Sequence, residues 1–361
     1  MLSGCAGSTA GADPLEAFVA GMPKAELHVH LEGTVAPAEA LEIAARNGAP
    51  APYESVAAFE AALNFDTLEA FLEAFHKTIA VLRTREDFYE ITYRYLSKSH
   101  AQNVRYVDLK FDPQAHLRRG IEFDEFFGGI LEAQQDAQRQ HGIVSQLIMC
   151  FQRDATLASA ELAYAQALKH RDHIVGIGLD NTEVLNFPAK FSELFGRARN
   201  DGFMLTAHCD LGQPNGVEHI RACIEDLRVN RLDHGYNILE DQRLVQIARA
   251  QQMCFTACPT SEFNTIDSAE RYYFREVARS VKLMLELGLC VTVNTDDPGV
   301  MGNRFLSEVL LDTARYLDLE RRQIVTLSEN ALSSLWVSGA QKQVYLDELA
   351  QYAKSHSISV G

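Results

Sequence analysis

The segment AELHVHLEGT, residues 25–34, indicates how the chain folds. A short apolar run carries His28 and His30 at its end, and a Gly turn follows at once. Residues two apart in a β-strand point to the same side. Both imidazoles would therefore share one face at the end of a strand. There they could bind one metal ion, or they could be two polar residues with no shared function.

Seven further runs are similar to the first, being short, apolar and rich in β-branched residues. The eight runs occupy residues 25–30, 104–111, 144–151, 174–180, 203–209, 231–236, 253–259 and 290–297. Amphipathic helical patterns separate most of them, and this alternation predicts a parallel sheet. Eight such units favour an α/β fold of the closed (β/α)8 type, the TIM barrel. An open doubly wound sheet is the alternative, but no Gly-rich phosphate loop follows the first run.

One interval between strands, residues 31–103, is too long to be a simple connection. It contains several helical patterns, in one of which Leu68, Phe71, Leu72 and Phe75 recur at helix spacing. We expect a helical insertion that packs on the barrel. Because it follows the first strand on the face where the strands end, we also expect it to act as a lid.

Composition limits the classes of protein to which the chain can belong. Its 361 residues are 47% hydrophobic, which is enough for a large core, and its net charge is −16. That charge argues against a nucleic-acid or membrane-surface partner, and no apolar run is long enough to span a membrane. We expect one barrel domain over residues 22–361, after a poorly ordered tail over residues 1–21. A homo-oligomer is compatible with this composition.

The cysteines bear on the cellular location. There are seven, and no CxxC pair occurs, which suits reduced thiols in the cytoplasm. One alternative arises because the stretch LSGC, ending at Cys5, resembles a lipoprotein cleavage site. No apolar stretch precedes it, so the chain would be exported or lipid-anchored only if a signal segment is missing.

Histidines and carboxylates gather where the predicted strands end. They are His28, His30, Asp180, Glu183, His208, Asp210, Asp233, His234, Asp296 and Asp297. Each alone has an ordinary structural explanation, but strand ends of a TIM barrel meet at the face that holds the active site. Together they indicate a metal site, and three imidazoles with one carboxylate suit Zn²⁺. The fourth strand offers no lysine to bridge two metals, so we expect one zinc per chain.

Seven stretches of the chain, in order, resemble the adenosine/adenine deaminase family of the amidohydrolase superfamily. They are PKAELHVHLEGT, FDPQAH, GIGLDNTEV, TAHCD, RLDHGYNILED, CPTSEFNT and VTVNTDDPGVMG, and they cover nearly all of the chain after about Met22. The resemblance implies a zinc-dependent aminohydrolase that acts on a 6-aminopurine. It also implies the metal ligands, which would be His28, His30, His208 and Asp296.

The resemblance further implies roles for residues around the metal. Zinc would lower the pKa of a water to near 7, and the resulting hydroxide would attack C6 of the purine. His234 would orient that water and stabilise charge. Asp297 would hydrogen-bond N7 and help to take the proton of the water, while Gly33 and Asp180 would lie against the substrate.

The sequence departs from the family at the group that protonates N1. The family pattern is HAGE, whereas this chain has His208, Cys209, Asp210 and Leu211 in those places. Loss of a general acid typically costs about 10²–10⁴-fold in rate. Three hypotheses follow: Asp210 replaces the missing Glu, Glu218 replaces it, or the protein is impaired as a deaminase and acts otherwise.

Glu183 bears on the choice of substrate. Nucleoside deaminases of the family have a small residue at this position, which leaves room for ribose, whereas a carboxylate suits the ring N–H of a free base. We therefore expect adenine or an N6-substituted adenine, such as a cytokinin, as the substrate. One alternative is adenosine deaminase proper, and another is a non-catalytic zinc-bound barrel with a binding role. Glu183 could also point to solvent.

Overall fold

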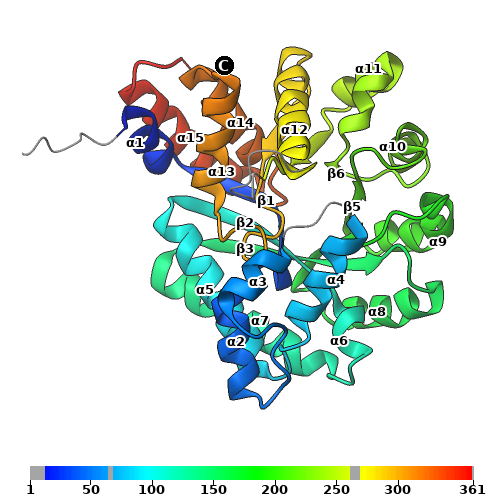
Figure 1. Ribbon diagram of the computed structural model, residues 1–361. Coiled ribbons are helices and arrows are strands. Elements are labelled where there is room, and N and C mark those ends of the chain that lie inside the picture. Colours follow the sequence, from blue (N-terminus) through cyan, green and yellow to red (C-terminus); the bar gives the residue numbers. More distant parts are fainter. Residues whose placement is uncertain (1–12, 64–67, 261–268, 360–361) are drawn as a thin grey trace, which may run out of the picture.

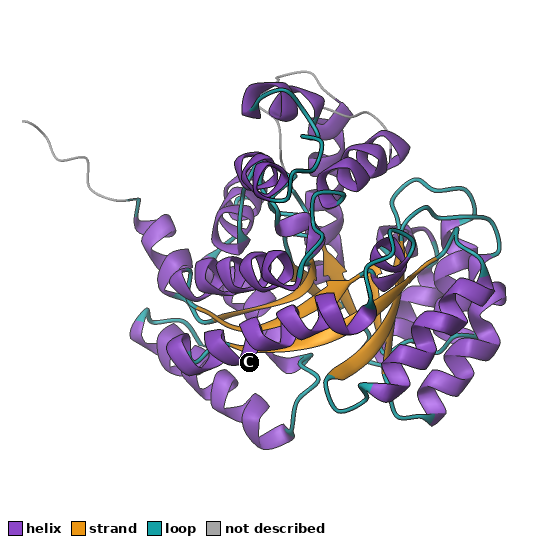
Figure 2. Ribbon diagram, turned by 90° about the horizontal axis from the view of Figure 1, so that it is seen from below, coloured by secondary structure: helices purple, strands orange, loops and turns teal. Residues whose placement is uncertain are grey.

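Eight parallel strands form the centre of the computed structural model, which describes residues 13–63, 68–260 and 269–359 (Figures 1 and 2). Each strand pairs with the next along the chain, in the order β1 to β8. Their bounds are β1 Lys24–His30, β2 Val104–Phe111, β3 Val144–Gln152, β4 Ile174–Asp180, β5 Met204–Cys209, β6 Arg231–His234, β7 Cys254–Ala257 and β8 Cys290–Val293. Every predicted run contains a strand, so the prediction of a TIM barrel is confirmed.

The first and last strands meet beside the HxH pair. Val29 and Asp296 form an isolated parallel bridge. The amide of His30 donates to the carbonyl of Asp296 at 2.8 Å, and the amide of Asp296 donates to the carbonyl of His28 at 3.1 Å. This contact ties Asp296 to the two histidines through the backbone alone.

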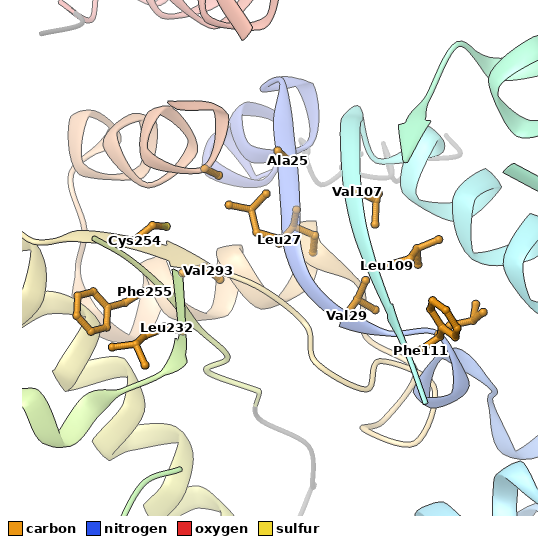
Figure 3. Packing of buried hydrophobic residues seen from close by; sticks show 14 of the residues in the cluster. Ala25, Leu27, Val29, Val107, Leu109, Phe111, Leu232, Cys254, Phe255 and Val293 are labelled. Carbon is orange, nitrogen blue, oxygen red and sulfur yellow. The ribbon is translucent and has the colours of Figure 1, made fainter. Parts of the chain in front are cut away.

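Residues along β1 alternate between two environments. Ala25, Leu27 and Val29 belong to the buried apolar layer that packs around the strands (Figure 3). His28 and His30 alternate with them, so their side chains point to the opposite side, into the barrel. The same alternation fills the interior of the barrel with polar side chains from several strands.

Helices surround the strands (Figure 2). Outside the insertion their bounds are α1 Pro14–Gly21, α6 Pro113–Leu117, α7 Phe123–His141, α8 Leu157–Lys169, α9 Phe187–Asn200, α10 Gly216–Glu225, η2 Tyr236–Glu240, α11 Gln242–Ala250, α12 Ala269–Glu286, α13 Leu306–Leu317, α14 Arg321–Ser333 and α15 Gly339–Ser355. Within the described residues, none of the helices has the length and apolar character that crossing a membrane requires.

The N-terminal segment differs from the expectation of a poorly ordered tail through residue 21. Residues Pro14–Gly21 form α1, which begins after an Asp13 cap and buries Phe18 and Val19. The Tyr352 hydroxyl donates to the carbonyl of Phe18 at 2.7 Å and fastens α1 to α15. The apolar pair gives this short helix a face to bury, so the folded domain begins before residue 22. The LSGC stretch lies outside the described residues.

The helical insertion predicted after the first strand is present. It comprises η1 Glu32–Thr34, α2 Pro37–Arg46, α3 Val56–Ala62, α4 Leu68–Ile79 and α5 Arg85–Ala101. The apolar side chains Phe71, Leu72 and Phe75 of α4 line a cavity at the ends of the strands. The insertion therefore supplies one wall of the region where the polar residues gather.

Candidate metal and active site

The four residues expected to bind metal converge at the ends of β1, β5 and β8. The Nε2 atom of His208 lies 3.1 Å from that of His28 and 3.2 Å from that of His30. Asp296 Oδ1 lies 3.1 Å from His28 Nε2 and 3.4 Å from His30 Nε2. Ligands about 2.0–2.1 Å from a tetrahedral zinc ion are about 3.3 Å apart, so these four atoms fit its corners.

Hydrogen bonds on the far side of the rings leave the inward nitrogens free to bind a cation. His208 Nδ1 donates to the carbonyl of Leu179 at 2.7 Å. His28 Nδ1 lies 2.9 Å from the hydroxyl of Thr256, which itself donates to Asp233 at 2.8 Å. Both imidazoles therefore carry their proton on Nδ1 and present a lone pair at Nε2.

Burial keeps these imidazoles neutral. It lowers the pKa of His28 and His208, and it lowers the pKa of His30 to about 3. The nearby Lys110 ammonium adds to the fall in each case. A neutral imidazole is the form that binds a metal ion, so protons do not compete for this site near neutral pH.

A buried ion pair lies beneath the metal ligands. Lys110 Nζ of β2 lies 2.6 Å from Asp233 Oδ2 of β6, and both side chains are inaccessible to solvent. Burial would raise the pKa of Asp233, but the adjacent Lys110 ammonium holds it below its ordinary value. Thr206 also donates to this carboxylate, at 2.7 Å. Asp233 thus stays charged and fixes the hydroxyl that orients His28.

Removing the ammonium should destabilise the fold. We expect Lys110→Met to lower the free energy of unfolding by about 3–5 kcal/mol, because it leaves the Asp233 charge buried without its partner. Urea-induced unfolding of the metal-loaded chain measures the change. Lys169→Met, at an exposed position of α8, is the matched control and should stay within about 0.5 kcal/mol of the native chain. Equal stability of the two variants would contradict the role assigned to the pair.

His234 and Asp296 adopt unusual backbone conformations at the centre of the site. Their φ angles are +61° and +62°, in the left-handed region that residues other than glycine seldom occupy. His234 Nε2 lies 3.6 Å from Asp296 Oδ2 and 3.5 Å from Asp210 Oδ1. Such backbone strain is concentrated at functional sites. The structure thus brings His234 and Asp210 together beside the metal ligands.

Gly33 and Asp297 are in direct contact. A Cβ atom placed on Gly33 would lie only 1.8 Å from Asp297 Oδ1. The carbonyl of Gly33 also accepts a hydrogen bond from the amide of Gly299 at 2.8 Å. Only glycine therefore lets the Asp297 side chain keep its position at the end of β8.

These residues surround a cavity of about 460 Å³, counting the part that opens to solvent. Its lining consists of His30, Phe71, Leu72, Phe75, Asp112, Arg153, Asp180, Asn181, His208, Asp210, His234, Asp296 and Asp297. An apolar wall with a few polar groups opposite is typical of small-molecule sites. Five of the residues expected to act on substrate therefore meet here or touch the lining: Gly33, Asp180, Asp210, His234 and Asp297.

Glu183 differs from the expectation of substrate contact. Glu183 is not among the described residues that line the cavity. Its carboxylate accepts from Arg153 at 3.1 Å, from His219 at 2.6 Å and from the amide of Asp210 at 2.7 Å. These donors compensate the buried charge that a substrate N–H was expected to compensate. Glu218 lies in α10, where it lines a different surface cavity.

Two ionisable residues of the lining, Asp112 and Arg153, are absent from the site residues expected from the sequence. Each directly follows a strand, β2 in one case and β3 in the other. Asp112 lies beside Asp180, which faces His30 Nδ1 at 3.7 Å. Burial raises the pKa of both carboxyl groups, and the charge of Asp180 adds to the rise at Asp112. Their position at strand ends was the available signal.

Comparisons with known proteins agree with this geometry. The family model for adenosine deaminase matches residues 23–352. An adenine deaminase of Sphingopyxis alaskensis is 38% identical over 339 residues, which cover 93% of this chain and 96% of that protein. An uncharacterized deaminase of Schizosaccharomyces pombe is 38% identical over 342 residues, which cover 95% of this chain and 99% of that protein.

Solved structures give the same result. The adenine deaminase of Arthrobacter aurescens superposes with a TM-score of 0.86 at 34% identity, covering 92% of this chain and 100% of that one. An amidohydrolase of Burkholderia ambifaria with bound Zn superposes with a TM-score of 0.82 at 27% identity, covering 97% of each chain. The chain belongs to the adenosine deaminase family of the amidohydrolase superfamily.

Proposed function

We propose that this chain hydrolyses adenine or an N6-substituted adenine as the free base, with one zinc ion per chain. Hydrolytic deamination of an adenine-type purine follows from the family and from adenine deaminases that match the chain over nearly their whole length. The observation that carries the proposal is the convergence of three neutral imidazoles and Asp296 within 4.8 Å. A zinc ion there would supply an activated water near neutral pH.

The chain's own residues are assigned to the remaining tasks. Asp297 accepts the proton of the attacking water and a hydrogen bond from the purine at N7, and His234 orients that water. Asp210 protonates N1, in place of the Glu that Leu211 replaces. A C6–O bond forms, the C6–N bond breaks, and the amine leaves with the proton that Asp297 took from the water. The proton that remains on the new hydroxyl returns to Asp210, which leaves a 6-oxopurine protonated at N1. Asp180 and Gly33 form the adjacent walls of the pocket.

Preference for a base without a phosphate is supported by the charge of the cavity. Arg153 is the one Lys or Arg among the described residues of the lining, and its donors are already bonded to protein groups. A nucleotide would find no free cation for its phosphate there. The apolar face of α4, with Phe71 and Phe75, instead suits a flat aromatic ring, and we propose that this helix acts as the lid.

We propose a cytoplasmic location, which the free cysteines of the described residues support. A direct assay can identify which purine the chain prefers as its substrate.

The purified, zinc-loaded chain should be given adenine, N6-isopentenyladenine, adenosine and AMP, with the ultraviolet spectrum and ammonia release followed together. We expect kcat/KM for one of the two free bases to exceed that for adenosine and AMP at least tenfold, about 1.4 kcal/mol of discrimination. A preference for adenosine would favour adenosine deaminase proper. No reaction at high enzyme concentration would favour the non-catalytic alternative.

A further inference from the structure

The guanidinium group of Arg153 fills a gap between two strands. The pairing of β4 with β5 comprises Gly176 with Met204 and Ile177 with Leu205, and it stops well before the strands end. Beyond it, Arg153 Nε donates to the carbonyl of Asp180 at 3.0 Å, and Nη1 donates to the carbonyl of His208 at 2.9 Å. Because its side chain is only 1% exposed, this bridge is shielded from water.

Every donor of the guanidinium group is accounted for. Besides those two carbonyls, Nη1 donates to Glu183 Oε2 at 3.1 Å, and Nη2 donates to Asp210 Oδ2 at 2.7 Å and to the carbonyl of Asn181. These are five bonds from the five N–H groups of one arginine. The ring of Phe187 lies 5.1 Å from the guanidinium carbon. Arg153 therefore has no donor left for a ligand.

Asp210 is held at two points by this arrangement. Its amide donates to Glu183 Oε2 at 2.7 Å, and its Oδ2 accepts from Arg153 at 2.7 Å. Glu183 is fixed in turn by His219, whose Nδ1 lies 2.6 Å from Oε1. The other oxygen of Asp210, Oδ1, faces His234 at 3.5 Å and the cavity. Backbone and carboxylate are thus oriented by the same buried pair.

We propose that Arg153 and Glu183 are positioning residues for deamination, because together they fix the Asp210 carboxylate with Oδ1 turned towards His234 and the substrate. The inference rests on the proposed function, in which Asp210 acts on the purine. It assigns Glu183 a role through Asp210 and not through the substrate. A positioned acid must lie within hydrogen-bond reach of its target, so loss of this orientation lowers kcat more than it raises KM.

Arg153→Lys is the first test, because it keeps the buried positive charge beside Glu183. A lysine has three donors on a compact head and cannot span both carboxylates and the strand carbonyls. We expect kcat for the preferred base to fall at least tenfold, KM to change less than threefold, and zinc content to stay at one per chain. Arg119→Met is the matched control, since Arg119 also donates to three backbone carbonyls but does not line the cavity.

A double-mutant cycle separates positioning from a merely structural role. If Arg153 acts through Asp210, the variant Arg153→Lys/Asp210→Asn should be no more than about twofold slower than Asp210→Asn alone. Losses that multiply would show independent contributions and overturn the proposal. So would native kcat in Arg153→Lys, or a loss of rate that follows loss of zinc.

A second variant keeps the proposal testable if Arg153→Lys fails to fold. The variant Arg153→Met/Glu183→Gln removes both buried charges together, which is tolerated far better than removing one. It should fold, bind zinc and show the same fall in kcat. If neither background folds, Arg153 is a structural residue and the proposal is overturned. If the native chain deaminates no 6-aminopurine, the proposed function itself has failed before any variant is compared.

Discussion

The His30→Ala variant is expected to lose its metal and to deaminate its purine at least about 1,000-fold more slowly than the native chain. The His30 Nε2 atom lies 3.2 Å from that of His208 and 3.4 Å from Asp296 Oδ1, so its loss leaves a three-ligand site. A bound metal contributes several kcal/mol of transition-state stabilisation, and each 1.36 kcal/mol is a factor of ten in rate. Elemental analysis and initial rates measure the two effects together.

The position of His30 makes this variant informative. Its ring lines the cavity, and among the described residues its Nδ1 atom has only the distant contact with Asp180 at 3.7 Å, so alanine should leave the barrel folded. His173→Ala, at an exposed position, is the matched control and should retain both the metal and the native rate. Full activity in a folded His30→Ala chain would show that the four donors do not form the working site.

The Asp297→Asn variant is expected to keep its zinc and lose about 10²–10⁴-fold in kcat, the usual contribution of a positioned acid or base. Asparagine preserves the shape of the side chain against Gly33 and can still hydrogen-bond a purine nitrogen, but it cannot take a proton. KM should therefore change little. Rates across a range of substrate concentrations, with metal content, separate these effects.

The contact between Gly33 and Asp297 offers a second test of Asp297 as the acceptor of the proton, through a change at Gly33. Gly33→Ala would place a methyl group 1.8 Å from the present position of Asp297 Oδ1 and must displace it. Both variants should then be slow while binding one zinc per chain. Asp172→Asn, at an exposed position, is the control. Native kcat in Asp297→Asn would exclude Asp297 as the acceptor of the proton.

Much of the site could be predicted from the sequence because consecutive strands of a barrel are neighbours, and their ends all lie at one face. His28 and His30 share a face by the period of a strand, and parallel strand ends meet at one mouth. His208 and Asp296 then join them, although they are 180 and 268 residues from His28 in the chain. Residues at the strand ends could therefore be assigned to the site without knowing how the side chains pack.

Residues beyond the strand ends could not be placed in the same way. The sequence indicates that Glu183 is a carboxylate near the mouth, but its direction is set by Arg153 and by His219 of α10. Lys110 lies within a predicted strand, and only the barrel shows that it faces Asp233. Such contacts depend on which side chains complement each other's charge across strands, and spacing along the chain does not report this.

Elemental analysis of the native chain, combined with the rate of deamination during stepwise chelation and restoration of zinc, tests the convergence of the four ligands most directly. We predict one zinc ion per chain and a rate that falls and recovers in proportion to zinc content. A chain that remains fully active with no divalent metal bound would contradict the assignment of the site.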